Sequence, residues 1–558
     1  MITVNRAIAK ALKIFDIDVV FGLPNDDLLL MKEIKNQNID FVVTKDQRNA
    51  MFMTVGYALS KKSLGVCVVG KGPALTNCVT GLLEGHAQSV PVLILASGTS
   101  TPMYGEKKGF QETKQIEIVR SLTKWSHRLE TSDSIDWVLH KAAFIALNGT
   151  PGIVYIEIPE NLSTAFVDEK AFQISKIETP LFTPNIKYML KMKKILEEAK
   201  KPVLIIGGGL KGSVNSQIIE RFVEKLGCAV YVTASGRGAF YEKHPLFCGL
   251  MGLYSHPYMK EIIIESDFIM VLGSKLEETS IFGLEQTLQN KKNMIQVNIN
   301  EDDFNLRFPS LKLLGDGESV MEELSVDMDN ISNRDEWKEF IQVKKKMLFD
   351  FSEKKITENS LQIKDILKAI DRCIPENAIF VHENGLQDMW TYFYPHHVLK
   401  KDQNAFVPSE QTSLGFGVAA ATGIAKAFPN NPVVVLAGDG AFNMFLSDLP
   451  TQLMQNIPII YVIFNNGGYG WLEYQNHYKD EIGSFIDRNI RLDKLANEKL
   501  QFISIRKNEE IIQAFSKGLQ YYFEGKTVIL DFNVELSDVP KTLEKIYGNF
   551  PCIEEDFT

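Results

Sequence analysis

The sequence has little cysteine and no long hydrophobic segment. Only six of its 558 residues are cysteine, without a CxxC pair or a framework spacing, which excludes a disulfide scaffold and is typical of reduced proteins. No uninterrupted apolar run approaches the roughly 20 residues that span a bilayer. The N-terminus is typical of an amphipathic helix capped by Thr3, not of a signal peptide. We therefore expect a cytoplasmic protein without membrane contact.

Basic residues are too few and too scattered for a nucleic-acid surface. The chain carries 60 Lys and Arg against 70 Asp and Glu, a net charge of −10, and no basic stripe interrupts this balance, so nucleic acid is not expected as a partner. Its nine histidines form no cluster with aspartates, which disfavours a metal-only hydrolase. We expect His382, His396 and His397 to be loop or interface residues, not ligands.

Two apolar, β-rich runs near the C-terminus each end in a polar, glycine-rich turn. They are residues 433–440 (VVVLAGDG) and residues 459–468 (IIYVIFNNGG). Asp439 and Asn466 are 27 residues apart, enough for one helical crossover between parallel strands. Because such strands end at one edge of a sheet, a carboxylate, an amide oxygen and backbone carbonyls would gather there. Mg²⁺ prefers such oxygen ligands, and glycines let a diphosphate approach the backbone.

An N-terminal segment repeats this pattern without the aspartate. The strand-like residues 66–69 lead into Gly-Lys-Gly at 70–72, a helix-like stretch and a second strand that begins near Pro91. The step from the second glycine to the proline is 19 residues here and 18 in the C-terminal copy. We therefore expect two α/β domains of one architecture, with the metal only in the second.

A third α/β region lies between the two copies. Its strand-like runs are residues 202–206, followed by three glycines, and residues 268–273 and 294–298. The sequence therefore predicts an α/β fold with three doubly wound parallel-sheet domains. Polar stretches predict domains at residues 1–180, 188–334 and 356–558. We expect the charged, helix-like run at residues 335–355 to be a solvated linker helix.

Several separated motifs resemble those of the acetolactate synthase-like branch of thiamine-diphosphate (ThDP) enzymes, over nearly the whole chain. The paired turns described above resemble the ThDP-binding motif of that family. Asn25 stands where the family commonly has Gly. The other matching segments are FGLP at 21–24, TKDQRNAMFM at 44–53, GKGPALTN at 70–77, GFQE at 109–112, GRGAF at 236–240, HPL at 244–246, GLQDMW at 385–390 and LGFG at 414–417.

The resemblance implies a pyrimidine-binding, a middle and a diphosphate-binding domain. The cofactor would bridge the first domain of one subunit and the third of another, which requires a homodimer or homotetramer. Asp439 and Asn466 would be side-chain ligands of Mg²⁺, and Gly468 a carbonyl ligand. The implied cofactor-binding residues are Pro24, Gln47, Gly72, Asn77, Gly385, Leu386, Gln387, Thr412, Leu414, Gly438, Asp439, Gly440, Ala441, Asn466, Gly468, Tyr469 and Gly470.

Three residues are implied to be catalytic: Gln47, Gln111 and Leu414. Leu414 would force the two cofactor rings together, and Gln111 would lie on a loop that contacts the substrate. Without the resemblance, Leu414 could just as well be an ordinary core leucine. Gln111 would then be interpreted as a surface glutamine.

Gln47 is the departure that matters most, because the family normally has a glutamate there that contacts the pyrimidine ring nitrogen. A glutamine can hydrogen-bond this nitrogen but cannot take or share its proton. Three explanations compete: an engineered Glu-to-Gln trap, a natural working variant, and a degenerate homologue with low activity. We favour the natural variant. Asp46 is not expected to substitute, because adjacent residues of a strand point to opposite faces.

The implied activity is decarboxylation of a small, pyruvate-like 2-oxo acid followed by carboligation to a carbonyl acceptor. A simple 2-oxo acid decarboxylase or C–C lyase, and a non-catalytic ThDP-binding homologue, remain alternatives. Lys71 and Ala74 replace the usual Ser and Gly of SGPG, and WLEYQ at 471–475 replaces a Met-Val-Arg-Gln-Trp-like run. We therefore expect a different acceptor pocket and leave the acceptor open.

FAD is an open question in the middle domain. The GRGAF segment and the three glycines after a strand suit a dinucleotide. However, KLEE at 275–278 stands where acetolactate synthases have Arg-Phe-Asp-Asp, and Asn298 and Asn300 replace aspartates. An empty, purely structural middle domain is the alternative.

Overall fold

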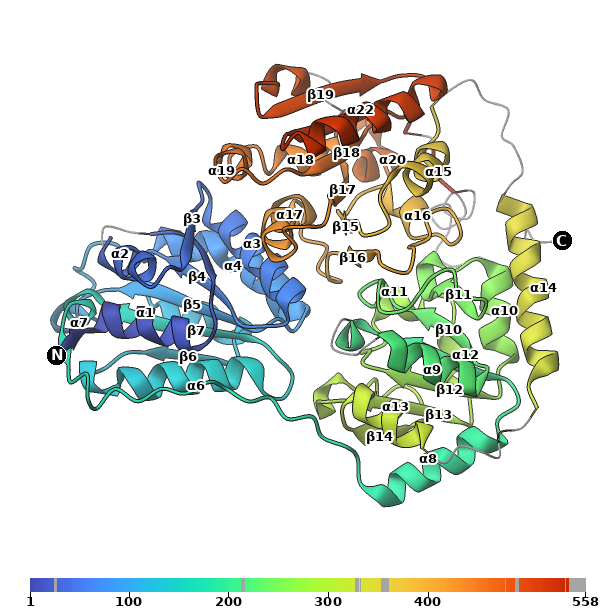
Figure 1. Ribbon diagram of the computed structural model, residues 1–558, viewed down its shortest axis with the longest axis horizontal. Helices are drawn as coiled ribbons and strands as arrows, with labels where there is room; N and C mark the ends of the chain where they lie inside the picture. The colour runs from blue at the N-terminus through green and yellow to red at the C-terminus, as the bar shows by residue number, and fades with distance from the viewer. Residues whose placement is uncertain are drawn as a thin grey trace. The chain divides into compact units, whose positions relative to one another are not determined.

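The computed structural model describes residues 1–24, 28–211, 216–326, 331, 333–352, 361–476, 478–486, 491–536 and 538–540 (Figure 1). Asn25, Cys552 and the end of the predicted linker helix, residues 353–355, lie outside them. The chain divides into two compact units. Unit 1 comprises residues 1–180, 411–430 and 443–459, and unit 2 comprises residues 181–410, 431–442 and 460–558. Among the described helices, none is long and apolar enough to cross a membrane.

The predicted α/β fold with three parallel sheets is confirmed. Each sheet has six strands, and every neighbouring pair within them is parallel. The strands are β2 (Val19–Leu23), β3 (Asp40–Val43), β4 (Gly65–Val69), β5 (Val92–Gly98), β6 (Trp125–Arg128) and β7 (Ile153–Pro159); β9 (Pro202–Ile206), β10 (Ala229–Val232), β11 (Phe247–Leu250), β12 (Phe268–Leu272), β13 (Met294–Asn298) and β14 (Leu311–Leu314); and β15 (Ile379–His382), β16 (Asn404–Phe406), β17 (Val433–Gly438), β18 (Ile460–Asn465), β19 (Leu500–Ile505) and β20 (Thr527–Asn533). A short antiparallel pair joins β1 (Ile2–Thr3) and β8 (Phe166–Val167).

Strand order reveals which sheets are related. The N-terminal sheet runs β3-β2-β4-β5-β7-β6 and the C-terminal sheet runs β16-β15-β17-β18-β20-β19. Counted along the chain, both orders are second, first, third, fourth, sixth, fifth, so the predicted duplication is confirmed at the level of topology. The middle sheet runs β11-β10-β9-β12-β13-β14, the order of a dinucleotide-binding doubly wound fold.

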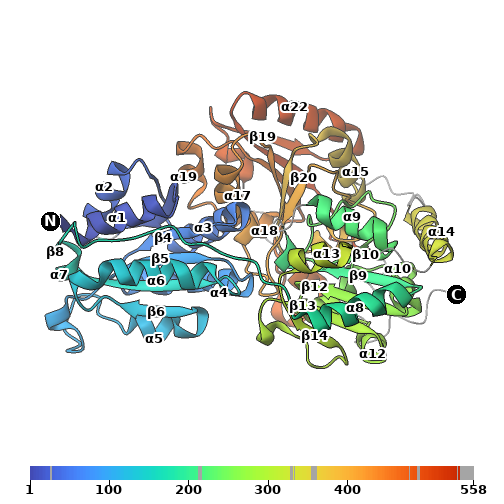
Figure 2. The ribbon, with the colours of Figure 1, turned by 60° about the horizontal axis from the view of Figure 1, so that its bottom comes forward.

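Helices alternate with the strands and cover the sheets. Their bounds are α1 (Val4–Ile14), α2 (Leu29–Asn36), α3 (Gln47–Lys61), α4 (Pro73–Ala87), α5 (Gln115–Val119), α6 (Ile135–Leu147), α7 (Glu160–Ser163), α8 (Ile186–Glu198), α9 (Ser216–Leu226), α10 (Pro257–Glu265), α11 (Glu278–Ile281), α12 (Glu285–Gln289), α13 (Gly317–Ser325), α14 (Asp335–Ser352), α15 (Ile363–Cys373), α16 (Asp388–Thr391), α17 (Phe416–Ala427), α18 (Asp439–Asn443), α19 (Leu449–Met454), α20 (Gly470–Tyr474), α21 (Lys479–Ile482) and α22 (Ile511–Phe523). The N-terminal helix begins as predicted, since Thr3 Oγ1 accepts a hydrogen bond from the Arg6 N–H at 3.3 Å. In unit 1, α1 and α6 share one apolar core with the sheet (Figure 2).

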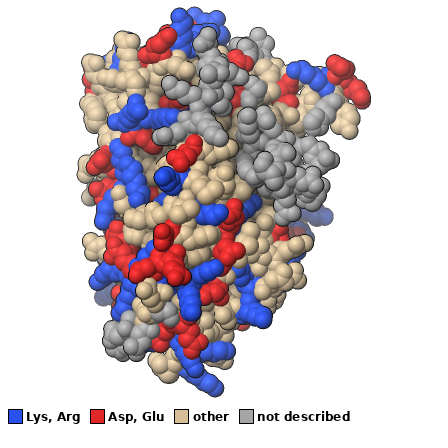
Figure 3. Space-filling model, turned by 90° about the vertical axis from the view of Figure 1, so that its right-hand side faces the viewer, with Lys and Arg blue, Asp and Glu red and all other residues tan. Residues whose placement is uncertain are grey.

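The charged helix α14 is not a freely solvated linker. Its residues Trp337, Ile341 and Leu348 belong to the apolar core of the middle sheet. The indole Nε1 of Trp337 donates to Pro202 O at 3.1 Å, and Lys345 Nζ donates to Pro245 O at 2.9 Å. Apolar residues at helical spacing lie among the charged residues of this segment, and they pack α14 onto the middle domain. On the face shown in Figure 3, acidic and basic side chains are interspersed. The predicted domain boundaries stay predictions.

Candidate cofactor site

The paired turns of the C-terminal sheet lie side by side. Strands β17 and β18 are parallel neighbours, with Gly438 opposite Phe464. Asp439 and Asn466 directly follow their two strands. The backbone N–H groups of Asn466 and Gly467 favour the ionised Asp439 carboxylate, and the Gly467 N–H donates to Asn465 Oδ1 at 3.0 Å. The crossover therefore brings the carboxylate and the asparagine to one edge of the sheet.

Two oxygen atoms at this edge are buried without a hydrogen-bond donor. They are Asp439 Oδ1 and Asn466 Oδ1, neither of which has a partner within the described part of the chain. Asp439 is only 6% exposed, and burial raises the pKa of its carboxyl group to about 6. Buried oxygens without partners cost free energy. A hard cation would satisfy both oxygens and favour the ionised carboxylate, so these residues fit Mg²⁺.

Glycines shape the backbone around the two oxygens. A Cβ atom on Gly470 would lie 2.0 Å from Asn466 Nδ2, so glycine is required where the asparagine side chain packs. A Cβ atom on Gly440 would lie 3.1 Å from the Gly468 carbonyl oxygen. This proximity places the third predicted metal ligand, Gly468, beside the turn that carries Asp439. Tyr469, which packs on Gly440, is 46% exposed.

The loop after β15 contacts the same turn. Gln387 is buried and donates from Nε2 to Glu383 O at 2.8 Å. Its Oε1 lies 3.4 Å from the position of a Cβ atom on Gly438 and 2.4 Å from that of a Cβ atom on Gly385. Leu386, which precedes Gln387, and Ala441, which follows Gly440, are also buried. In unit 2 the structure thus gathers the predicted residues of the diphosphate end.

A second group of predicted residues lies in unit 1, around the first turn of α3. Gln47 opens this helix, and its Oε1 accepts a hydrogen bond from Asn77 Nδ2 at 2.8 Å. The same Asn77 amide lies 3.3 Å from Asp46 Oδ1. Because Asn77 holds the carbonyl side of the Gln47 amide, the NH₂ side of Gln47 is left as the donor.

Asp46 and Gln47 lie at the start of a helix, so the expectation that they point to opposite faces of a strand is wrong. Asp46 and Gln47 are not strand residues: Asp46 is the N-cap of α3, and both side chains reach the same Asn77 amide. A different contact engages the Asp46 carboxylate, since its Oδ1 accepts the Arg48 N–H at 2.8 Å as a helix cap. The sequence-based expectation assumed that strand β3 continues to Asp46, but the strand ends three residues earlier, at Val43.

Gly72 and Gln111 meet in unit 1. A Cβ atom on Gly72, whose φ is +58°, would lie 2.9 Å from Gln111 O. Gln115 was missed from sequence: it is 1% exposed, accepts the Gly72 N–H at 2.8 Å and donates to Ser97 O at 3.0 Å. It ties the Gly-Lys-Gly turn to the end of β5. A lone glutamine after the FQE motif gives no sequence signal for this role.

The remaining predicted residues, Pro24, Thr412 and Leu414, also lie in unit 1. Leu414 is half-buried, just before Gly415 at the start of α17. The Ser413 N–H between Thr412 and Leu414 donates to Glu84 Oε2 at 3.4 Å. Glu84 belongs to α4, the helix that carries Asn77. Among the described residues, no hydrogen bond joins Pro24, Thr412 or Leu414 to the Gln47–Asn77 pair.

Comparison with known proteins matches each sheet to a domain of one family. Residues 2–118 match "Thiamine pyrophosphate enzyme, N-terminal TPP binding domain", residues 189–324 match its "central domain", and residues 384–531 match its "C-terminal TPP binding domain". The chain belongs to the thiamine pyrophosphate enzyme family. It is a ThDP-dependent enzyme of the carboligase and decarboxylase kind.

Similar proteins carry acetolactate synthase names. A probable acetolactate synthase large subunit of Methanocaldococcus jannaschii is 27% identical over 85% of this chain and 82% of its own length. The acetolactate synthase large subunit of Lactococcus lactis is 27% identical over 86% and 83%, and acetolactate synthase of Mycobacterium leprae is 26% identical over 96% and 87%. At this identity they support an acetolactate synthase-like enzyme without fixing its substrates.

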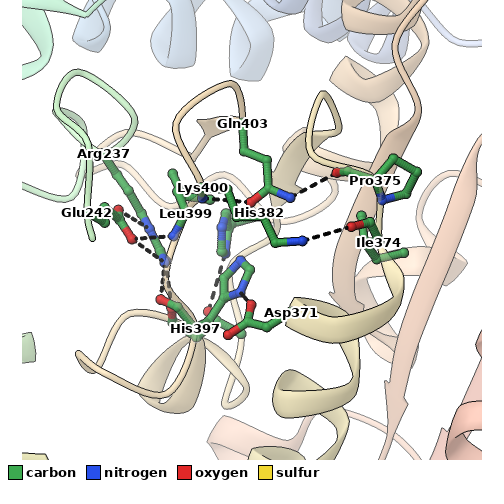
Figure 4. Close-up of polar contacts among 11 residues, drawn as sticks. Arg237, Glu242, Asp371, Ile374, Pro375, His382, His397, Leu399, Lys400 and Gln403 are labelled. Carbon is green, nitrogen blue, oxygen red and sulfur yellow. Dashed lines mark hydrogen bonds and ion pairs between the residues drawn. The ribbon is translucent and has the colours of Figure 1, made fainter. Parts of the chain in front are cut away.

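The GRGAF segment of this ThDP enzyme is committed to contacts inside unit 2 (Figure 4). Arg237 is 1% exposed, and its Nε lies 3.1 Å from Glu242 Oε1. The same guanidinium donates to Thr391 O at 2.5 Å and to His397 O at 2.8 Å. Its cation therefore fastens the middle sheet to the loop after α16 and is not free to receive a dinucleotide phosphate.

The same network corrects the expectation for His382. His382 ends β15 and is buried, with a pKa well below its ordinary value because burial and the nearby Arg237 charge disfavour its cation. The buried His397 contacts Asp371 Oδ1 through Nδ1 at 3.2 Å. His382 is therefore a buried strand residue and not a loop residue, whereas His397 lies in the loop after α16, as expected, and is buried there.

The carboxyl edge of the middle sheet is filled by its own polar groups. Asn298 Nδ2 donates to Ser274 O at 3.1 Å and to Asp303 O at 3.0 Å. Lys275 Nζ lies 3.6 Å from Asp303 Oδ1. Asn298 and Lys275, which stand where the family has an aspartate and an arginine, thus both bind Asp303, an arrangement that does not fit FAD.

Glu277 at this edge gives a testable pH dependence. Burial, and secondarily the Glu410 charge, raises its pKa to about 7. Because the folded state binds the proton more tightly than the unfolded state, stability should fall as pH rises from about 4.5 to about 7. Glu277→Gln should remove this loss and stabilise the protein at pH 8 by about 2–3 kcal/mol, with little effect at pH 4.5. Thermal unfolding at both pH values measures it.

The exposed Glu301 offers a matched control, since Glu301→Gln removes a charge without a burial cost. It should leave the pH dependence of the melting temperature unchanged. An identical pH profile for Glu277→Gln and wild type would contradict the buried-carboxylate interpretation.

Proposed function

We propose that this enzyme binds ThDP through Mg²⁺, decarboxylates a small, pyruvate-like 2-oxo acid and joins the remaining unit to a carbonyl acceptor. The observation that carries the proposal is the pair of buried oxygens on Asp439 and Asn466 at one sheet edge, which have no hydrogen-bond partner among the described residues. Such a site suits an ion that bridges the protein to a diphosphate.

Asp439, Asn466 and the Gly468 carbonyl would hold the ion. The turns at 385–387 and 438–441 would hold the diphosphate on backbone N–H groups. When bound, ThDP supplies a carbon nucleophile and an electron sink for 2-oxo acid chemistry. The chain contributes binding, orientation and proton placement. As in the implied family arrangement, we propose a homodimer or homotetramer.

The protein's own contribution to proton placement centres on Gln47. Asn77 Nδ2 donates to Gln47 Oε1, which leaves the Gln47 NH₂ as the donor side of the amide. That group can hydrogen-bond the pyrimidine nitrogen but cannot exchange a proton with it. We propose a natural, working variant that binds the pyrimidine in the ordinary place and deprotonates the cofactor more slowly.

FAD is not part of the proposed function. Arg237 and Asn298 are engaged within the protein, which supports a structural role for the middle domain. The alternative activity is a simple decarboxylase or C–C lyase, favoured by α20. There Glu473 accepts from Phe485 N at 2.8 Å and pairs with Lys479 at 2.6 Å, so this segment differs from an acceptor-binding run.

Product analysis separates these activities. Protein loaded with ThDP and Mg²⁺ is given ¹³C-labelled pyruvate with and without carbonyl acceptors, and products are identified by NMR. We expect CO₂ release together with a C–C coupled product. Release of aldehyde alone would assign a decarboxylase, and ThDP binding without CO₂ release would assign the low-activity homologue.

A further inference from the structure

Lys71 occupies an unusual place for a lysine. It lies in the Gly-Lys-Gly turn directly after β4, where the family's SGPG motif has a serine. It is only 5% exposed. The turn is fixed on its far side, because the Gly72 N–H is bound by Gln115 and α4 begins at Pro73. A cation has thus been introduced at the carboxyl edge of the N-terminal sheet.

The Lys71 ammonium is incompletely paired. It donates to Glu160 Oε1, and its Nζ lies 5.6 Å from the centre of the Phe110 ring. An ammonium group has three N–H donors, and among the described residues Glu160 is the acceptor that this one has. A buried charge without full hydrogen bonding is costly, so the site favours a further anionic partner.

The loop over Lys71 is the one that carries Gln111. Glu112 folds this loop by accepting the Gly105 N–H at 2.6 Å and the Gly109 N–H at 3.1 Å. Phe110 is 69% exposed and Gln111 packs its backbone on Gly72. Lys71 therefore lies beneath an exposed aromatic ring, next to the residue implied to contact substrate. Displacement of that ring would uncover the ammonium.

We propose that Lys71 selects a carbonyl acceptor that carries a carboxylate, which it binds by a charge-assisted hydrogen bond. This inference rests on the proposed carboligase function. The 46% exposed Glu160 side chain can turn to solvent when the acceptor's carboxylate takes its place.

The donor's carboxylate is not the group that Lys71 binds. It must leave as neutral CO₂, and a cation against it would stabilise the ground state more than the transition state. The acceptor keeps its anionic group throughout the reaction, so a cation can bind it without that penalty. Lys479, at the start of α21, is paired with Glu473 of α20, so it is not a free cation for this carboxylate.

The test compares acceptors that differ by one carboxylate, with pyruvate as donor. The pairs are glyoxylate against acetaldehyde and 4-oxobutanoate against butanal. Wild type should prefer the anionic member of at least one pair in kcat/KM. Lys71→Met should lower that preference about tenfold or more, the effect of one charge-assisted hydrogen bond, and Lys71→Arg should retain most of it.

Glu160→Gln distinguishes substrate binding from a purely structural ion pair. If Lys71 binds the acceptor, freeing its ammonium should keep or strengthen the preference. Equal losses for both members of each pair in Lys71→Met, or the same loss in Glu160→Gln as in Lys71→Met, would overturn the inference. So would equal use of both members by wild type. Should Lys71→Met fail to fold, Lys71→Arg and Glu160→Gln still decide the question.

Lys10→Met is the matched control, because Lys10 also pairs with a glutamate, Glu169, but lies on α1. It should leave the acceptor preference as in wild type. Failure of the proposed function would look different, since wild type would then form no coupled product with any acceptor.

Discussion

Replacing Asp439 with alanine is expected to abolish productive ThDP binding. The substitution removes the carboxylate that faces Asn466 and leaves the Asn466 amide oxygen as the remaining side-chain ligand. Loss of even supporting groups around a metal typically costs 10–100-fold in affinity, so loss of a charged ligand should cost about 100-fold or more. Isothermal titration with ThDP at saturating Mg²⁺ measures the change.

Gly470→Ala tests the same site without touching a ligand. Its new methyl group would meet the Asn466 amide at 2.0 Å, so Asn466 should move and ThDP affinity should fall while Asp439 is retained. Circular dichroism should show both variants folded. Wild-type ThDP affinity in Asp439→Ala would remove the basis for a metal at this edge.

Gln47→Glu is expected to accelerate proton–deuterium exchange at the thiazolium carbon of bound ThDP. The glutamate would keep the Asn77 hydrogen bond and add a group that can share a proton with the pyrimidine. A positioned acid–base group typically contributes about 10²- to 10⁴-fold, which sets the expected size. Quenched-flow exchange followed by NMR of the released cofactor measures it.

Asp46→Asn serves as the companion variant, because Asp46 shares the Asn77 amide with Gln47. If Asp46 only caps α3, its substitution should lower stability by about 1 kcal/mol without changing the exchange rate. A large fall in exchange would instead make Asp46 the proton acceptor. Equal exchange rates in Gln47→Glu and wild type would refute the idea that Gln47 slows deprotonation.

The sequence was a good guide wherever one rule of local chemistry decided the outcome. Apolar runs with β-branched residues predicted the strands β4, β17 and β18, and the near-equal glycine-to-proline steps predicted two sheets of one topology. Parallel pairing then required Asp439 and Asn466 to end at the same edge. The sequence-based prediction was wrong at α14, where an apolar face lies among charged residues. It was also wrong at Asp46, where strand β3 was assumed to continue past Val43.

The sequence by itself determined the three-sheet α/β fold, the family and the turns that face one another across β17 and β18, since periodicity and spacing along the chain encode them. Only the tertiary structure decided how Arg237, Asn298, Gln115 and Lys71 are used. Arg237 binds His397 and Lys71 binds Glu160, both far away in the chain, and Asn298 binds Ser274, which follows the neighbouring strand β12. Such contacts depend on how packed elements meet, and no local pattern records where a long side chain will find its partner.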